Sequence, residues 1–226
     1  MQPYFFPYIG YFQLICSSDA FVIFDDVNFI KKGWINRNRI LSAGEPKLIT
    51  LELIGASQNK LIKQLSIGNN NKKLLKTIQY NYAKAPYFKT VYPLIEEILS
   101  FPESNLAKYL ENSLKKVCDY LQIETNWYIS STLDKQNTLT GENRILDICE
   151  VMNAKHYINL PGGRNLYNTS SFKNSGIELS FINMHTYPYS QFDKPFVGGL
   201  SIIDIMMFND REQCNKMANQ FSLDEA

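Results

Sequence analysis

The sequence predicts an α/β protein with a Rossmann-like, mostly parallel sheet and an inserted helical block. Three observations lead to this class. Strand-like segments alternate with helical ones in the C-terminal half, a long central stretch has only helical periodicity, and polar residues follow the ends of strand-like segments. With 226 residues, the chain is long enough to bury a substantial core as a single domain over residues 1–226.

The first 55 residues predict a loop, a short helix, a strand and a hairpin, in that order. Pro3, Pro7 and Gly10 prevent a regular helix across "MQPYFFPYIGYF", because proline lacks an N–H donor and biases the preceding residue toward extended geometry. "GYFQLICSSD" then predicts a short helix, and "AFVIFDD" a buried strand that opens onto a loop. "INRNRIL" and "KLITLEL" flank the turn "SAGEP" and predict a β-hairpin.

Residues 70–121 predict three helices. Apolar residues recur there at helical spacing, and Pro86 and Pro102 separate the three runs. No strand-like segment lies between them. We therefore expect a helical subdomain at about 70–121 that is inserted in, or packs against, the α/β core.

The C-terminal half predicts strands at 127–130, 156–159 and 177–182. A helix with Thr140 as its N-cap lies between the first two, and a shorter helix ending at Gly176 lies before the third. "LSIIDIMMF" and "DREQCNKMANQF" predict two closing helices, the second capped by Asp210. Strands that alternate with helices imply parallel pairing, with ligands bound beyond the carboxyl ends of the strands.

Charge and hydropathy argue against several functional classes. Lys and Arg number 23 against 22 for Asp and Glu, so no overall field favours nucleic acid, and no nucleic-acid partner is expected. The longest apolar runs fall well short of the roughly 20 residues that cross a bilayer. The N-terminus lacks the basic leader and uninterrupted apolar region of a signal peptide. We expect no membrane span and a cytoplasmic location.

Metal and disulfide chemistry are not expected either. The four cysteines, at 16, 118, 149 and 214, have no CxxC spacing, and three fall on apolar faces of predicted helices, so we expect reduced packing cysteines. His156 and His185 have no ligand-type neighbour at helical spacing. The prediction is that the protein holds no metal and no cofactor.

The stretch "FDDVNFIKKGWINRNRI" is the best candidate for an anion site. Asp25 and Asp26 follow a buried strand, and planar guanidinium groups and a tryptophan face suit phosphates, carboxylates, sugars or bases. The predicted binding residues of this stretch are Lys31, Trp34, Asn36, Arg37, Asn38 and Arg39. Strand alternation places Arg37 and Arg39 on one face. The alternative is a solvated hairpin on which the acidic pair neutralises the basic residues without any ligand.

The opening loop is a second candidate. Gln2, Tyr4, Tyr8 and Tyr11 would lie beside the strand that ends at Asp25 and offer stacking surfaces with hydroxyl tips. Aromatic clusters are more often simple core, and this is the expectation for the phenylalanines at 5, 6 and 12.

Further candidates follow the later strands. "LPGGRNLY" places Gly162 and Gly163 where backbone amides can approach a ligand, and Tyr167 adds a polar ring, although a tight turn alone also explains the glycines. Gln191 and Asp204 come later, and Asp204 is alternatively an interior-facing helix residue. For proton transfer the candidates are Asp25, Asp26 and His185, although a structural histidine is the more common case.

The stretches "MQPYFFPYIGYFQLI", "DDVNFIKKGWINRNRI", "YINLPGGRNLY", "GIELSFI" and "LSIID" together resemble the WbqC-like protein family of bacterial surface-polysaccharide gene clusters. The resemblance covers essentially the whole chain. It implies a role in O-antigen or capsule synthesis, in which transfer of an acyl group such as glycine to an amino sugar has been proposed for some members. By position it also points to Gln2, Pro3, Pro7, Gly10, Asp25, Asp26, Lys31, Trp34, Asn36, Arg37, Asn38, Arg39, Gly162, Gly163, Tyr167 and Asp204.

From residues and resemblance together we expect a transferase that acts on a nucleotide-linked or other phosphorylated amino sugar. Arg37 and Arg39 would hold the diphosphate, Trp34 or a tyrosine would cover the sugar or base, and Asp25 or Asp26 would orient or deprotonate the acceptor. Two alternatives stay open. One is a nucleotidylyltransferase-like enzyme, suggested by the loop "PYFFPYIGY", and the other is a non-enzymatic protein that binds a glycan or a partner.

Overall fold

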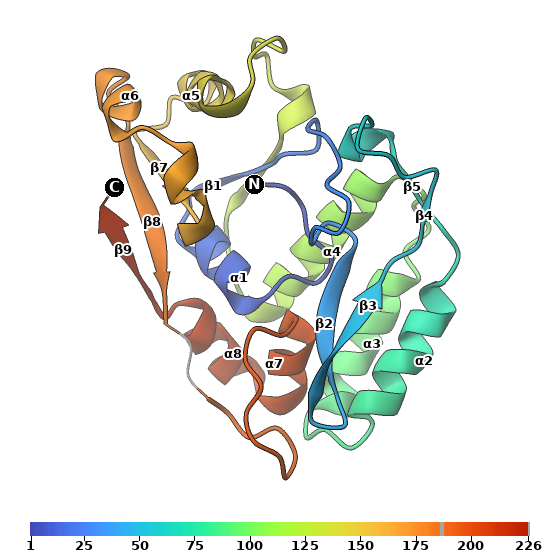
Figure 1. The fold of residues 1–226 in the computed structure, drawn as a ribbon. Helices are drawn as coiled ribbons and strands as arrows, with labels where there is room; N and C mark the ends of the chain where they lie inside the picture. The colour runs from blue at the N-terminus through green and yellow to red at the C-terminus, as the bar shows by residue number, and fades with distance from the viewer. Residues whose placement is uncertain (186–187, 226) are drawn as a thin grey trace.

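The N-terminal part forms the predicted helix, strand and hairpin. A computed structural model describes residues 1–185 and 188–225. Helix α1 (Ile9–Cys16) leads to strand β1 (Ala20–Ile23), and β2 (Arg37–Ser42) pairs antiparallel with β3 (Glu45–Thr50) as a hairpin (Figure 1). Ala43 and Gly44 both have positive φ at the turn, which a glycine adopts without strain. Two short strands not predicted from the sequence, β4 (Leu53–Ile54) and β5 (Ser66–Ile67), pair on either side of the 3₁₀ turn η1 (Ile62–Gln64).

The three predicted central helices are confirmed as α2 (Asn71–Tyr82), α3 (Phe88–Leu99) and α4 (Leu106–Leu121). They lie together on one side of the molecule, beside the hairpin (Figure 1). Their apolar stripes are buried, as Ile78, Ile95 and Leu110 show with no exposed surface. Asn105 caps α4 by accepting from the Lys108 amide, and Gln122 ends it in the left-handed region at φ 56. Whether the three helices form a subdomain of their own stays a prediction.

The C-terminal half also follows the predicted order. It contains β6 (Asn126–Ile129), the 3₁₀ turn η2 (Ser130–Thr132), α5 (Gly141–Val151), β7 (His156–Asn159), the 3₁₀ segment η3 (Pro161–Leu166), α6 (Thr169–Asn174), β8 (Glu178–Met184), α7 (Ile202–Phe208), α8 (Arg211–Ala218) and β9 (Phe221–Glu225). Asp210 caps α8 as predicted, since its carboxylate accepts from the Gln213 amide. Strand β9 was not predicted, because "FSLDE" follows a helical pattern with little apolar alternation of its own.

The predicted Rossmann-like sheet is not confirmed. Parallel pairing is limited to β1 with β6 and β7 with β8, and β9 adds to β8 in the antiparallel sense. Within the described residues, these pairs belong to two separate sheets. Between β1 and β7 lies a cavity of about 480 Å³, so the two strands do not form a continuous ladder. The protein is a mixed α/β protein with small sheets.

The opening loop is held in the core between β2 and α7. Phe5, Phe6 and Phe12 have no exposed surface, which confirms their predicted core role. Phe6 has a φ of 43°, an unusual value for a residue with a side chain. Its carbonyl accepts from Asn38 Nδ2 at 2.7 Å and from Ser201 Oγ at 2.8 Å. These two bonds fix the strained backbone, so the loop is a rigid part of the fold.

Candidate functional site

Asp25 joins the carboxyl ends of β1 and β6. Its Oδ1 accepts from the Ser131 amide at 2.9 Å, and its Oδ2 accepts from Ser131 Oγ at 2.7 Å. Ser131 lies in η2, directly after β6, the parallel partner of β1. Because both oxygens of this buried carboxylate bond one residue, Asp25 is a structural tie between the two strand ends.

Asp26 is the centre of a buried charged group that we call the Asp26 cluster: Asp26, Lys135 and Arg144. Asp26 Oδ2 accepts from Lys135 Nζ at 2.7 Å and pairs with Arg144 Nη2 at 2.5 Å. The side chain of Lys135 is 0 % exposed and that of Asp26 is 5 % exposed. Burial by itself raises the pKa of Asp26, but the hydrogen bonds from Lys135 and Ser130, with the positive charges of Arg144 and Lys135, outweigh it and lower the pKa below its ordinary value. Asp26 is therefore ionised at neutral pH.

Two polar atoms of the Asp26 cluster have no partner among the described residues. These are Asp26 Oδ1 and Arg144 Nε, both buried. A buried polar atom without a partner costs about 1–3 kcal/mol, and native proteins normally satisfy such atoms. The cluster borders a cavity of about 450 Å³ that is also lined by Phe24, Thr140 and Tyr167, and it lies at the N-terminal end of α5. Asp26 and Arg144 thus line the cavity, and each has one buried polar atom without a partner.

Tyr167 links this cavity to the carboxyl end of β7. Asn159 Nδ2 lies 3.2 Å from each of the hydroxyls of Tyr157 and Tyr167, which are 3.3 Å apart. Gly163 lies close beneath them, because a Cβ there would lie 2.8 Å from Asn159 Nδ2 and would force that side chain to shift. Gly162 has no such neighbour within 4 Å. Of the three residues predicted here, Tyr167 lines the cavity, Gly163 supports it, and Gly162 only continues the turn.

The predicted arginines lie on Trp34 and not beside the acidic pair. The guanidinium carbons of Arg37 and Arg39 are 5.8 Å and 5.2 Å from the Trp34 ring centroid. We call these three residues the Trp34 platform. Arg37 is also bonded within its own loop, to the Gly33 carbonyl at 2.8 Å and to the Lys32 carbonyl. Arg39 is exposed, so of the two arginines it is the one more open to a ligand.

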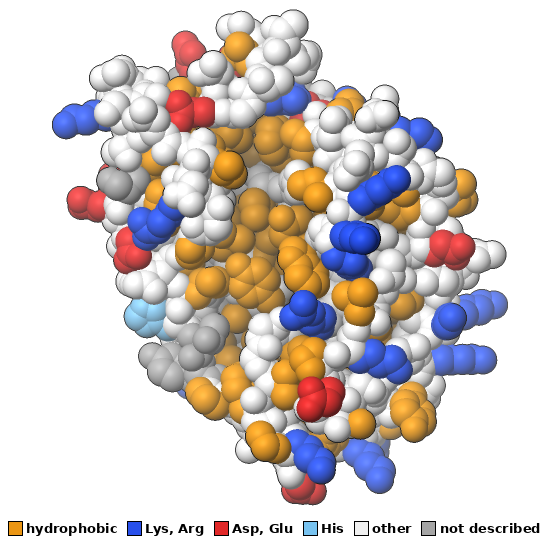
Figure 2. All heavy atoms as spheres, viewed as in Figure 1, with side chains coloured by type: hydrophobic (Ala, Val, Ile, Leu, Met, Phe, Trp, Pro, Cys, Tyr) orange, Lys and Arg blue, Asp and Glu red, His pale blue; other side chains and the backbone are white. Residues whose placement is uncertain are grey.

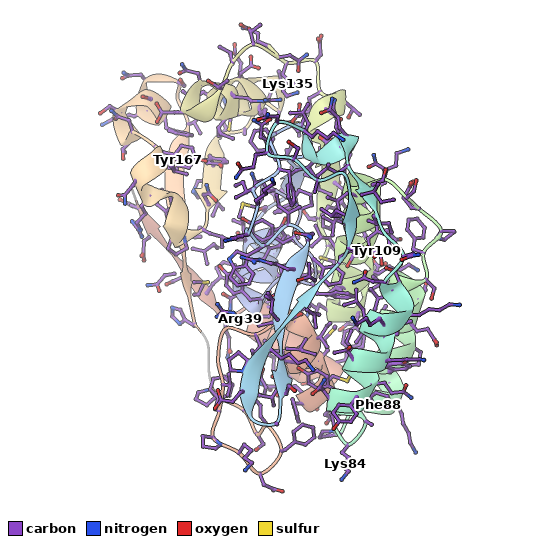
Figure 3. All side chains as sticks on the ribbon, turned by 45° about the vertical axis from the view of Figure 1, so that its right-hand side comes forward. Arg39, Lys84, Phe88, Tyr109, Lys135 and Tyr167 are labelled. Atoms are coloured by element: carbon purple, nitrogen blue, oxygen red, sulfur yellow. The ribbon has the colours of Figure 1, made fainter. Side chains whose placement is uncertain are left out.

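The Trp34 platform and the Asp26 cluster occupy different places. Figure 3 shows Arg39 on β2 well apart from Lys135, whose ammonium group bonds Asp26. In residues 1–185 and 188–225 the structure has no ion pair between the two aspartates and Arg37 or Arg39. Figure 2 shows basic side chains along one border of a hydrophobic hollow. Lys31 is exposed on the same loop as Trp34.

The two predicted asparagines have structural contacts. Asn36 Nδ2 donates to the Leu51 carbonyl at 2.8 Å, and Asn38 Nδ2 donates to the carbonyls of Phe5 and Phe6. Both therefore hold the hairpin against its neighbours. The amide group of Asn38 uses both of its donors in these bonds, and that of Asn36 uses one.

The tyrosines of the opening loop differ in burial. Tyr11 is fully buried, and its hydroxyl donates to the Gln2 carbonyl at 2.7 Å. Tyr4 packs on Tyr11 with ring centroids 5.4 Å apart, and both Tyr4 and Tyr8 are half-buried. Burial raises the pKa of each of the three hydroxyls. Tyr4 and Tyr8 remain candidates for ligand contact, whereas Tyr11 is a core residue.

Asp204 and Gln191 belong to a second buried group, the Asp204 cluster: Asp204, Tyr82, Tyr189 and Gln191. Asp204 Oδ1 accepts from the Tyr82 hydroxyl at 2.8 Å, and Oδ2 accepts from the Tyr189 hydroxyl at 2.6 Å and from Gln191 Nε2 at 2.5 Å. Burial raises the pKa of Asp204, although the three donors lower it in part. The cluster ties α2 and the 189–197 segment to α7.

His185 is exposed at the end of β8. Its Nε2 lies 3.2 Å from Ser222 Oγ on β9, and no bond joins it to either acidic cluster in the part of the chain that is described. Its predicted neighbour Tyr187 lies outside the described residues. The structure therefore gives His185 no contact that would support proton transfer at the cavity.

Three residues of the candidate site were missed from the sequence: Ser131, Lys135 and Arg144. The available signal was positional, because Ser131 and Lys135 follow the strand β6 and Arg144 lies in the first turns of a predicted helix. No local pattern distinguishes a buried lysine from a solvated one, so the pairing could not be foreseen.

Two absences are findings about the described residues only. No helix in 1–185 or 188–225 has both the length and the apolar character needed to span a membrane. Over the same residues, no three His, Cys, Asp or Glu side chains gather closely enough to bind a metal ion.

The fold and the site thus define a mixed α/β protein with a buried carboxylate–cation cluster at the ends of parallel strands. Residues 2–216 match the WbqC-like protein family, and the chain belongs to that family. It is 26 % identical over 211 residues to the uncharacterized protein Rv1507c of Mycobacterium tuberculosis, covering 91 % of this chain and 90 % of that protein. No solved structure matches the chain.

Proposed function

We propose that this protein is a transferase of surface-polysaccharide biosynthesis that acts on a nucleotide-linked or otherwise phosphorylated amino sugar. The reaction is transfer of an acyl group, with glycyl as one candidate, from an activated ester or thioester to the sugar amine. The amine nitrogen forms a bond to the acyl carbon, the bond from that carbon to the carrier oxygen or sulfur breaks, and the amine loses a proton. Membership of the WbqC-like family supports this proposal.

The observation that carries the proposal is the unpartnered Oδ1 of Asp26 beside the cavity at the strand ends. Oδ2 is fixed by Lys135 and Arg144, so the direction of the carboxylate is set before any ligand arrives. An ionised carboxylate of this kind accepts a hydrogen bond from an amine or hydroxyl. Its lowered pKa makes it a weak base. We therefore propose that Asp26 orients the acceptor amine and does not remove its proton.

The Trp34 platform supplies the complementary half of the proposed substrate site. A nucleotide sugar is an extended ligand whose sugar and nucleotide ends contact different parts of a protein. An indole face stacks on a base, and the guanidinium of Arg39 is exposed for a phosphate. Since Arg37 is held by its own loop, Arg39 is the stronger candidate for the phosphate contact.

The test is binding of a panel of nucleotide amino sugars, measured by calorimetry, for the natural protein and for Arg39→Ala. We expect Arg39→Ala to weaken binding by about 1–3 kcal/mol, the scale of a hydrogen bond to a charged group. Arg164→Ala is the matched control, because Arg164 is also an exposed arginine over an aromatic ring but pairs with Asp224. Equal affinity of the Arg39 and natural proteins would remove the platform from the site.

Turnover needs a separate measurement. Mass spectrometry of the sugar after incubation with protein and an activated acyl donor detects the added acyl mass. Asp26→Asn keeps the shape of the side chain but loses the charge, so we expect acyl transfer to fall while the protein still binds the nucleotide end. Binding of the sugar with no mass change under any donor would favour the non-enzymatic alternative.

A further inference from the structure

Residues 53–95 carry seven lysines and neither an arginine nor an acidic residue. Over the whole chain, basic and acidic residues nearly balance at 23 and 22, so this stretch is a local concentration of positive charge. The lysines are at positions 60, 63, 72, 73, 76, 84 and 89, and all seven are exposed. None of them forms an ion pair with another described residue, including Glu52 and Glu96, which border the stretch.

Helix α2 aligns part of this charge along one side. Lys73, Lys76 and Tyr80 follow one another at spacings of three and four residues on the helix. Lys84 comes four residues later, in the turn just after the helix. Residues at these spacings are neighbours on one side of a helix. The opposite side is in the core, as Ile78 shows with no exposed surface. We call Lys73, Lys76, Tyr80 and Lys84 the Tyr80 face.

Tyr80 is unusually exposed for an aromatic residue. Its side chain is 86 % exposed, more than any other large apolar side chain among the described residues. Figure 3 shows Lys84 at one end of the molecule, with its side chain directed away from the protein. A tyrosine ring with its hydroxyl, and lysine stems with their charged heads, both suit the boundary between lipid and water. The Tyr80 face therefore fits a surface that is apolar inside and negatively charged outside.

The residue types favour many separate lipid headgroups over a single bound phosphate or a nucleic acid. Arginine binds one phosphate through two parallel hydrogen bonds, whereas a lysine ammonium is a hydrated point charge without that geometry. Residues 40–143 contain no arginine. No residue of the Tyr80 face lines the cavities of about 480, 620 and 450 Å³. The face is thus suited to a broad charged surface and not to a small enclosed ligand.

We propose that the Tyr80 face binds the headgroups of an anionic lipid bilayer. The ammonium groups of its three lysines lie among the lipid phosphates, and the Tyr80 ring lies at the lipid–water boundary. Because the apolar side of α2 is already packed in the core, the helix rests on the bilayer and does not insert. Each lysine near such a surface strengthens binding about fivefold, so the three together contribute about 100-fold. This inference does not depend on the proposed transferase activity.

The experiment is co-sedimentation of the full chain with vesicles of phosphatidylcholine and phosphatidylglycerol, compared with vesicles of phosphatidylcholine alone. We expect binding only to the vesicles that contain phosphatidylglycerol. Binding should be lost at about 1 M salt, where the Debye length is about 3 Å. The triple variant Lys73→Gln, Lys76→Gln, Lys84→Gln should bind about 100-fold more weakly. Glutamine has nearly the helix propensity of lysine, so these exposed changes should leave the fold intact.

A charge-matched control carries Lys155→Gln, Lys173→Gln and Lys216→Gln. These lysines are also exposed but lie outside residues 53–95. The control should lose at most about twofold in binding, since charges more than a Debye length from the bilayer are largely screened. Tyr80→Ser leaves the charge unchanged and should weaken binding severalfold. Unchanged binding of Tyr80→Ser would overturn the place proposed for the ring.

Three other results would overturn the proposal as a whole. The first is no binding of the natural protein to the phosphatidylglycerol vesicles. The second is an equal loss in the two triple variants, because net charge and not the Tyr80 face would then explain the binding. The third is binding to duplex DNA that the Tyr80-face triple variant abolishes, with no binding to vesicles, which would assign the face to nucleic acid.

Discussion

The Asp26 and Asp204 clusters both bury an aspartate, yet they shift its pKa in opposite directions. Asp26 has two cationic partners, and its pKa is lowered despite burial. Asp204 has three neutral donors, and burial raises its pKa despite their hydrogen bonds. The difference teaches that three hydrogen bonds from neutral donors do not offset the desolvation of Asp204, whereas hydrogen bonds from Lys135 and Ser130 together with the charges of Arg144 and Lys135 do offset that of Asp26. The two clusters also differ in hydrogen bonding. Both carboxylate oxygens of Asp204 have a donor, whereas Oδ1 of Asp26 has none among the described residues.

The largest effect is expected from Asp26→Ala. Removal of the carboxylate leaves the fully buried Lys135 ammonium and Arg144 without their common partner, which should cost about 3–5 kcal/mol of unfolding free energy. Urea unfolding measures this value. Asp134→Ala is the control, because Asp134 is exposed beside Lys135 and should change stability by less than about 0.5 kcal/mol. A loss of under 1 kcal/mol for Asp26→Ala would show that water or local rearrangement replaces the pairing.

Asp204→Ala should have the next largest effect. It leaves the hydroxyls of Tyr82 and Tyr189 and the amide of Gln191 without their acceptor, at a cost of about 2–4 kcal/mol. Tyr189→Phe removes one donor and should cost about 1 kcal/mol, which makes it a graded control. Both values come from the same urea measurement. If the two variants were equally stable, the three bonds to Asp204 would not contribute separately, which would contradict the graded costs expected here.

The pH dependence of stability sharpens the comparison. The ionised form of Asp26 stabilises the fold above the ordinary carboxyl pKa of about 4, and this contribution is lost as the pH falls through the lowered pKa. The protonated form of Asp204 stabilises the fold below about pH 4, and its contribution is lost as the pH rises through the raised pKa.

Asparagine variants test these opposite signs. Measured against the natural protein, the destabilisation by Asp26→Asn should shrink below about pH 4, at up to about 1.4 kcal/mol for each unit of pKa difference. The destabilisation by Asp204→Asn should instead shrink as the pH rises from about 4 toward 7. Urea unfolding at several pH values gives both curves. Slopes of the same sign would contradict the contrast between the clusters.

The smallest expected effect comes from an exposed carboxylate, Asp210. It caps α8 through a 2.7 Å bond from the Gln213 amide. Asp210→Ala should cost about 1 kcal/mol, the usual value for an N-cap, and Asp210→Asn much less because the cap is kept. Thermal unfolding of both variants measures this. A cost as large as that of Asp204→Ala would mean that burial is not what distinguishes the two inner clusters.

Local elements were predictable because their signals are local. The 3.6-residue apolar period placed α2, α3 and α4, and the turn around Gly44 placed the β2–β3 hairpin. The short strand β4 carries too few residues for any period to show, and β9 follows a helical pattern. The Rossmann-like sheet was an inference from alternation of elements, and it required β1 and β7 to be joined across a gap that no local pattern describes.

The site was predictable in part. The position of Asp26 after "AFVIF" predicted that it lies at a strand end beside a pocket. Strand alternation predicted that Arg37 and Arg39 share a face. Their convergence with Asp26 did not follow. Trp34 lies within reach of both guanidinium groups in the same hairpin, and a local cation–aromatic contact costs less chain ordering than a distant ion pair.

The sequence by itself determined the helices, the longer strands other than β9, and the stretches that carry charge and aromatic surface, because these depend on spacing over a few residues. Only the tertiary structure decided the partners of the buried carboxylates. Lys135 is 109 residues from Asp26, and Tyr82 is 122 residues from Asp204. The physical reason is that a buried charge takes whichever partner packing brings within about 3 Å, and packing is a property of the whole chain.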